Sequence, residues 1–252
     1  MIALLSPAKS LDYDRPFDPV ATTNPRLAED ADTLAAAAAK LGAKKLGALM
    51  HISEKLATLN ADRFAGFAAA PERPAIHAFA GDVYVGFEAK SLDAPAIDFA
   101  QGHVRILSGL YGLLRPLDTI RPYRLEMGTR WAPGRARTLY AYWGSRVSDL
   151  LARDLAEEGS GVILNLASKE YWHAVETCPP AGARIIAVDF REEGPNGLRF
   201  NSFAAKRARG MMARWLCEHR IADPEALKNF DSDGYRYAGE AADGALWRFV
   251  RG

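Results

Sequence analysis

The chain has few of the residue patterns that mark disulfide-bonded, metal-binding or membrane proteins. Only two of its 252 residues are cysteines, Cys178 and Cys217, and its five histidines lack the spacing of metal ligands. Two isolated cysteines predict no disulfide framework and fit a reducing compartment, so we expect a cytoplasmic protein without a metal site. The apolar run at the N-terminus ends after five residues, and no segment has the length of a membrane span. Neither a signal peptide nor a membrane partner is therefore expected.

Motifs for common cofactors are absent as well. The sequence contains no Walker loop, no GxGxxG turn, no HExxH helix and no CxxC pair. Their absence argues against the standard nucleotide, dinucleotide and zinc sites, although an unusual site stays open. No cofactor is expected.

Positive charge is concentrated in two segments, although the net charge of the chain is only +1. Residues 105–137 contain seven arginines and no lysine, against Asp118 and Glu126 as the only acids. Residues 204–220 contain five basic residues against one acid. This distribution predicts a face or cleft that meets anions.

Apolar runs and helical patterns alternate along the chain. Strands are predicted at residues 2–5, 75–79, 104–114 (a strand or strand and turn), 162–166, 184–190 and 198–202, with a terminal hairpin at 235–237 and 246–250. Helices are predicted at residues 26–40, 44–50, 54–67, 98–101, 139–155, 169–176 and 203–219. This order predicts an α/β (mixed α+β) fold with a mixed, partly parallel sheet and flanking helices. Since no linker or internal repeat interrupts it, we expect a single domain over residues 1–252.

The second half of the segment 104–128 combines arginine and tyrosine with prolines that fix its backbone. Arginine binds phosphates or carboxylates bidentately, tyrosine can stack on bases or donate its hydroxyl, and a fixed loop holds both with little entropy loss. The segment therefore predicts an ordered anion site formed by Arg115, Arg121, Tyr123 and Arg124. The alternative is that these arginines pair with Asp118 and Glu126 and only rigidify the loop.

Polar residues also follow the predicted strands. Lys9 comes shortly after the strand at 2–5, where α/β proteins place ligands, and its alternative is an ordinary surface lysine. Asn165 and Ser168 lie between a strand and a helix whose N-terminus favours anions, and simple N-capping by Ser168 is the alternative. Lys206 and Arg209 share a helix face with Gly210, which permits close approach. We expect one cleft lined by Lys9, Arg115, Arg124, Lys206 and Arg209.

Six phrases carry a resemblance to a known family. They are SPAKSLD at 6–12, GDVY at 81–84, LSGLYGLLRPLD at 107–118, PYRLEMG at 122–128, NLAS at 165–168 and KRARG at 206–210. Together they span nearly the whole chain, and the sequence resembles the bacterial peroxide-stress YaaA family, with Ser10 and Phe87 as small departures from its pattern. The resemblance implies a cytoplasmic protein induced by hydrogen peroxide that limits unincorporated iron and so protects DNA. It also implies a single α/β domain with a positively charged cleft, and DNA binding through a helix-hairpin-helix element.

Residues 44–67 fit such an element. Leu46, Leu49, Ile52, Leu56 and Ala57 form its apolar skeleton, and four basic side chains lie nearby: Lys44, Lys45, Lys55 and Arg63. A helix-hairpin-helix presents backbone N–H groups to DNA phosphates, but His51 and Ser53 stand where glycines are usual. The alternative is an ordinary helical hairpin that packs on the core.

Three functions follow from these residues. The first is sequence-independent binding of double-stranded or branched DNA by a monomer without enzymatic activity. The second is an enzyme for a nucleotide or other small phosphate-bearing ligand, with Lys9, Glu126 and Lys206 as catalytic candidates beside Asp82, Tyr84, Tyr123 and Asn165. The third, an iron-binding buffer, ranks last because the histidines have no metal spacing. An effect on iron is therefore expected to be indirect.

Overall fold

A seven-stranded sheet forms the centre of the structure, a computed structural model that describes residues 1–252. The strand order is β4-β3-β1-β6-β7-β9-β8. The strands are β1 (Ile2–Leu5), β3 (Val104–Ser108), β4 (Gly112–Leu114), β6 (Val162–Asn165), β7 (Arg184–Glu192), β8 (Arg236–Glu240) and β9 (Leu246–Arg251). The five inner strands run parallel, and the edge strands β4 and β8 run antiparallel to their neighbours. The predicted mixed, partly parallel sheet is confirmed.

The chain changes direction across the sheet at β1. It passes from β1 to β3 on one side and returns to β6 on the other, so the carboxyl ends of these three strands are neighbours. All four residues of β1 are buried, which explains its unbroken apolar sequence. The core is a cluster of 66 buried apolar residues around this strand.

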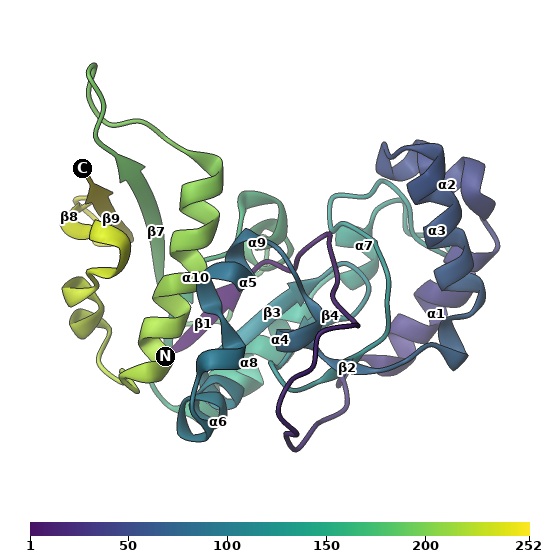
Figure 1. Cartoon of the computed structure of the whole chain (residues 1–252), viewed down its shortest axis with the longest axis horizontal. Helices are drawn as coiled ribbons and strands as arrows, with labels where there is room; N and C mark the ends of the chain where they lie inside the picture. The colour runs from purple at the N-terminus through teal and green to yellow at the C-terminus, as the bar shows by residue number, and fades with distance from the viewer.

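Helices surround the sheet and form a separate group at one end. Helices α1 (Ala28–Ala39), α2 (Gly42–Met50) and α3 (Glu54–Ala65) pack together beyond the β4 edge (Figure 1). Helices α6 (Ala94–His103) and α10 (Ser202–Glu218) contact each other and β1, whereas α8 (Arg146–Glu158) contacts β1 and β4. The remaining elements are α5 (Asp82–Phe87), α7 (Leu139–Trp143), α9 (Lys169–Glu176), and α4 (Ala75–Ala78) beside the two-stranded sheet of β2 (Arg73–Pro74) and β5 (Thr119–Ile120). No helix is both long and apolar enough to cross a membrane.

Helices α5 and α10 cross at two glycines. A Cβ atom on Gly210 would lie 1.8 Å from the Val83 carbonyl oxygen, and one on Gly86 would lie 2.1 Å from that of Arg207. The close approach expected at Gly210 is therefore made by the backbone of α5 to the backbone of α10. It fixes α10 on the rest of the fold.

Three predicted elements are wrong in type or extent. Residues 75–79 were expected as a strand but contain α4, because an apolar run that is buried on all sides has no periodicity to distinguish helix from strand. Residues 198–202, expected as a strand, form only one bridge, between Arg199 and Glu192, and Ser202 already begins α10. The helix expected over 139–155 breaks at Gly144, whose φ of 51° and ψ of −127° suit glycine alone.

Candidate functional site at the carboxyl ends of the parallel strands

Polar side chains gather where the three central strands end. Ser6 follows β1, while Ser108 and Asn165 are the last residues of β3 and β6. The Ser6 hydroxyl accepts a hydrogen bond from the Ser168 amide at 2.9 Å, and the Asn165 side-chain oxygen accepts one from the Ala167 amide at 3.0 Å. These bonds order the loops at the crevice where α/β proteins place ligands.

Ser168 stands at the N-cap position of α9, as expected, but its hydroxyl makes no capping hydrogen bond. The predicted capping role is therefore wrong. The Ser168 hydroxyl lies 3.3 Å from that of Ser6 instead. The first N–H groups of α9 consequently have no side-chain acceptor within the chain, which leaves the positive end of the helix dipole available at this edge.

Three buried tyrosines stand beside the strand ends. The Tyr84 hydroxyl donates to the Ser6 carbonyl at 3.1 Å, and the Tyr123 and Ser108 hydroxyls are 2.7 Å apart. Burial raises the pKa of Tyr84, Tyr123 and Tyr171 well above the usual range, and the nearby Tyr123 phenol raises the pKa of Tyr84 and Tyr171 further. The three phenols therefore stay neutral and act as hydrogen-bonding groups rather than as bases.

One carboxylate gathers two basic side chains in front of this cluster. Glu126 Oε1 lies 2.8 Å from Arg124 Nη2 and 3.4 Å from Lys9 Nζ. Arg124 and Glu126 are mostly buried, whereas the Lys9 side chain is 63% exposed. Glu126 Oε2 is buried and receives no hydrogen bond from the protein. Because buried carboxylate oxygens normally have donors, this oxygen is suited to accept one from a bound molecule.

A cleft of about 450 Å³ separates this group from the end of α2. Lys9, Glu126, Arg130 and Glu170 supply its charged side chains, and residues 48–51 form the opposite wall. Glu170 Oε1 accepts a hydrogen bond from the Gly128 amide at 3.0 Å, which orders the loop that carries Arg130. The cleft brings the end of α2 and the pair of Lys9 and Glu126 into one site.

The helical hairpin turns sharply between α2 and α3. His51 adopts the left-handed conformation, with φ of 52° and ψ of 49°, which glycine usually supplies at this position. The Ile52 amide donates to the Gly47 carbonyl at 3.2 Å, and the Ser53 hydroxyl accepts from the Leu56 amide at 3.4 Å. Gly47 packs closely on α3, since a Cβ there would lie 3.2 Å from that of Ala57. The hairpin thus keeps a tight turn without glycine at its tip.

The surface of this hairpin carries unpaired positive charge. Lys44, Lys45 and Lys55 are exposed, and no carboxylate lies within ion-pair distance of them or of Arg63. Arg63 is half-buried, and burial lowers its pKa. Only the three lysines are therefore freely available to an anion at this surface.

The arginines of the 104–128 segment are paired with acids. Arg115 contacts the fully buried Asp118 at 3.0 Å, Arg121 contacts Glu72 at 2.7 Å, and Arg124 contacts Glu126. These contacts match the alternative expected for this segment, in which the arginines form ion pairs that rigidify the loop. The charge left over for an anion is smaller than the arginine count suggested.

The five side chains expected in one cleft lie in three places. Lys9 and Arg124 meet at Glu126, as described above. Arg115 faces a different hollow, of about 620 Å³, together with Arg26 and Arg105. Arg209 is largely buried in α10, where burial lowers its pKa and Asp189 partly offsets that effect, and Lys206 lies over the Phe203 ring at 5.7 Å. Nothing joins Arg115, Lys206 or Arg209 to the cleft.

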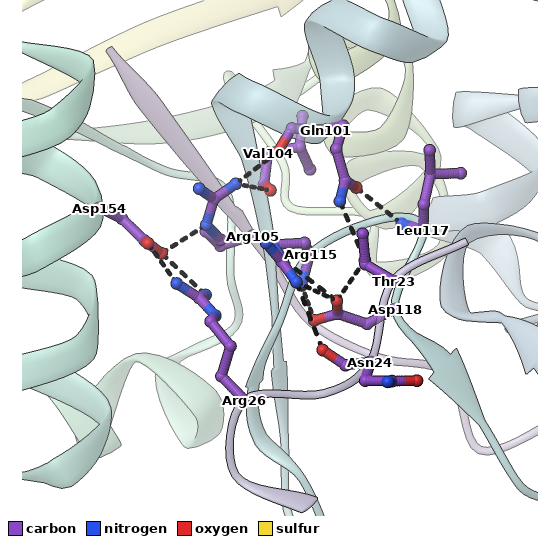
Figure 2. A network of polar contacts seen from close by, with 10 residues as sticks. All are labelled: Thr23, Asn24, Arg26, Gln101, Val104, Arg105, Arg115, Leu117, Asp118 and Asp154. Atoms are coloured by element: carbon purple, nitrogen blue, oxygen red, sulfur yellow. Dashed lines mark hydrogen bonds and ion pairs between the residues drawn. The ribbon is translucent and has the colours of Figure 1, made fainter. Parts of the chain in front are cut away.

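Figure 2 shows the polar network around Arg115, near the amino end of β3. The Asp154 carboxylate pairs with both Arg26 and Arg105, and Arg105 is 5% exposed. A second carboxylate, Asp118, accepts from the Thr23 hydroxyl at 2.6 Å as well as from Arg115. The network ties the segment before α1 to β3 and α8, so a structural role accounts for these charges.

Sequence reasoning missed several residues of the site. Ser6 and Ser108 lie at the ends of buried strands. The signal that could have identified them is a single hydroxyl residue directly after an apolar run. Arg130 and Glu170 line the same cleft only because the loop after β5 meets the start of α9 there. No group of three or more His, Cys, Asp or Glu side chains is placed to hold a metal ion.

Comparison with known proteins gives concordant matches. A family model described as peroxide stress protein YaaA matches residues 1–241. A UPF0246 protein of Rhizorhabdus wittichii is 70% identical over 251 residues, which cover 100% of this chain and 99% of that protein. UPF0246 proteins of Ralstonia nicotianae and Saccharophagus degradans are 48% and 45% identical, again over 100% of this chain and 99% of each relative.

Proposed function

Since this chain belongs to the peroxide stress protein YaaA family, we propose that it binds DNA without sequence preference, through the α2–α3 hairpin and the adjoining cleft. The proposed cellular role is cytoplasmic protection of DNA during peroxide stress by limiting unincorporated iron, with an indirect effect on iron. This is the role that the family resemblance implies. The tight turn at His51 is the observation that carries the DNA-binding part.

The turn supports contact with a phosphate because it exposes backbone donors. The amides of the N-cap residue Ser53 and of Glu54 and Lys55, the first residues of α3, donate to no acceptor in the protein. The left-handed His51 directs the chain into this helix start, and His51 and Ser53 are both exposed. A helix start of this kind binds phosphate oxygens by its N–H groups and its dipole, with no information about the base.

The unpaired charges supply the long-range attraction. Lys55 lies in the first turn of α3 beside the turn, Lys44 and Lys45 lie near the start of α2, and Arg130 and Lys9, which pairs with Glu126, line the other side of the cleft. Phosphate contacts release condensed counterions, so affinity falls as salt rises. Five cations on this surface fit a site for consecutive phosphates of a backbone.

The test is duplex binding by hairpin variants. Fluorescence anisotropy with a labelled 20-base-pair duplex compares the wild type with the triple variant K44E/K45E/K55E. The matched control changes Arg153, Arg220 and Arg236 to glutamate, since these arginines are exposed and unpaired on other elements. We expect the hairpin variant to lose at least tenfold in affinity while the control keeps most of it. Equal losses in both variants, or no binding by the wild type, would refute the hairpin site.

A second function is supported by the buried Glu126 oxygen that has no donor. Lys9 lies beside this oxygen, and Arg130 and Glu170, at the start of α9, line the same cleft, so the cleft suits a nucleotide or other small phosphate-bearing ligand. Its volume falls within the range of ligand pockets. Lys9 and Glu126 are then the catalytic candidates, and Lys206 has no contact that supports this role.

This second function is tested by calorimetric titration with a panel of nucleoside mono-, di- and triphosphates. Saturable, stoichiometric binding that Glu126→Gln weakens at least tenfold would favour it. Glu176→Gln, an exposed substitution on α9, is the control. Binding of no member of the panel would leave DNA as the proposed partner.

A further inference from the structure

An arm of the chain projects beyond the end of β7 before the chain enters α10 (Figure 1). Its base is fixed, because the backbones of Glu192 and Arg199 bond to each other in both directions, at 2.9 and 3.0 Å. The turn at its tip closes with a hydrogen bond from the Gly197 amide to the Gly194 carbonyl at 3.0 Å. The arm is therefore a formed structure that holds its side chains in place.

The arm and the first turn of α10, which follows it, expose three large apolar side chains close together in the sequence. Phe203 is 72% exposed, Phe200 is 54% exposed and Leu198 is 48% exposed. Phe200 and Phe203 are the only large exposed aromatic side chains on the molecule, although the chain contains eleven phenylalanines. A fold that leaves two rings in water forgoes the free energy of burying them, which points to a partner for their faces.

Cations lie beside both rings. The Arg191 guanidinium is 5.4 Å from the centre of the Phe200 ring, and Lys206 Nζ is 5.7 Å from that of Phe203. Lys206 and the neighbouring Arg207 are exposed and pair with no carboxylate, while Arg199 pairs with Glu192 but stays 66% exposed. From 191 to 207 there are four basic residues and two acidic ones.

Ring faces interleaved with cations match single-stranded nucleic acid. Unpaired bases stack on aromatic rings, and the phosphates that alternate with them meet the cations. An apolar protein partner would use the rings but not the surplus of positive charge. The arm also leaves the sheet at the carboxyl end of β7, the same edge that carries Ser6, Ser108 and Asn165.

We propose that the arm is a second nucleic-acid contact, in which Phe200 and Phe203 stack on unpaired bases while Lys206 and Arg207 bind the backbone. The inference rests on the proposed function, DNA binding, and specifies the form of the DNA. A duplex lies at the hairpin, and an adjacent unpaired strand lies at the arm. Its chemistry is independent of the hairpin, so the two sites can be tested separately.

The experiment measures anisotropy with three labelled probes of equal length. They are a single strand of mixed sequence, the corresponding duplex, and a single strand whose central positions are abasic. The variant F200L/F203L keeps the apolar contact but removes the aromatic faces, and V85A, at another exposed apolar residue, is the control. Circular dichroism and thermal unfolding check that each variant folds.

The proposal predicts that F200L/F203L weakens binding of the single strand by at least about fivefold for each stacked base. Duplex binding and binding of the abasic strand stay within twofold of the wild type. The wild type binds the abasic strand about as weakly as the variant binds the normal one. Hairpin variants that abolish duplex binding leave this ratio between normal and abasic strands unchanged, so failure at one site is distinguishable from failure at the other.

Three results would overturn the proposal. One is unchanged single-strand binding in F200L/F203L. Another is an equal loss on normal and abasic strands, which would mean that the rings do not stack on bases. The third is self-association of the wild type that F200L/F203L abolishes in sedimentation, without any effect on the probes, because the arm would then be a contact between two copies of the chain.

Discussion

Replacing Asp154 by asparagine removes the negative charge on which the network of Figure 2 depends. Asp154 is 3% exposed, and its carboxylate is the only acidic partner of both Arg26 and Arg105. Arg105 is equally inaccessible, and burial already lowers its pKa, an effect that the hydrogen bond and charge of Asp154 oppose. Without the carboxylate, the guanidinium stays charged and buried without compensation.

The structure sets the size of the effect. Breaking a buried ion pair by removing one partner costs about 3–5 kcal/mol, and asparagine, which keeps an acceptor oxygen, should fall at the lower end. For a chain of this length, about 3 kcal/mol lowers Tm by roughly 6–12 °C. Glu157→Gln is the matched control, because Glu157 is an exposed, unpaired acid on the same helix. Its free energy of unfolding should change by less than about 0.5 kcal/mol.

The difference between the two proteins should also depend on pH. Burial alone would raise the pKa of Asp154, but the hydrogen bonds and charges of Arg26 and Arg105 outweigh it and hold that pKa below its ordinary 3.8. A lowered carboxyl pKa stabilises the fold fully above the unfolded value, and this stabilisation is lost as the pH falls through the folded value. Urea unfolding at pH 7 and below pH 4 measures both free energies. A pH-independent difference below about 1 kcal/mol would refute the reasoning.

Three further changes have clear expected outcomes. Gly210→Ala should cost about 3 kcal/mol or more in unfolding free energy, because its methyl group would meet the Val83 carbonyl, whereas Gly102→Ala, with open space around it, should be neutral or stabilising in the same urea assay. His51→Gly should stabilise the protein by up to about 1 kcal/mol, because glycine adopts the left-handed conformation without strain. Duplex binding should persist in this variant if the backbone amides contact the phosphates. A loss of duplex affinity would assign that contact to the imidazole. Burial lowers the pKa of His77 to about 4, aided by Arg73, so its neutral form favours the fold above the ordinary 6.5 and this contribution fades as the pH falls towards 4. His77→Gln should therefore flatten the stability profile between those pH values, and identical slopes for both proteins would contradict this cause.

Periodicity and apolar runs were sufficient for most of the fold. The helices around residues 44–67 have a helical periodicity, and the strand at Ile2–Leu5 was identified by its short apolar run and the stop at Ser6 and Pro7. Residues 75–79 have no such periodicity, because burial on all sides removes the contrast between faces. At 198–202 large apolar residues alternate with polar ones as they do in a strand. Only Arg199 of this segment pairs with a neighbouring strand, through Glu192. Strand formation depends on a partner that local sequence does not specify.

The site was harder to predict because partners come from distant segments. Lys9 and Glu126 meet although 117 positions separate them, and Arg121 pairs with Glu72 from a loop beyond α3. Sequence alone identified the arginines of 104–128 and two of the acids that pair with them, Asp118 and Glu126, but not Glu72, the partner of Arg121. The lysines of the hairpin are less concentrated in the sequence than these arginines, but they are the charges that have no carboxylate partner.

The salt dependence of duplex binding tests the central claim most directly. Each phosphate contact contributes a slope of about −0.9 to the plot of log affinity against log salt. Removing Lys44, Lys45 and Lys55 should therefore reduce the magnitude of the wild-type slope by about 3. The account predicts this reduction for K44A/K45A/K55A and none for alanine changes at Arg153, Arg220 and Arg236. Duplex binding whose salt slope is the same in both variants as in the wild type would contradict it.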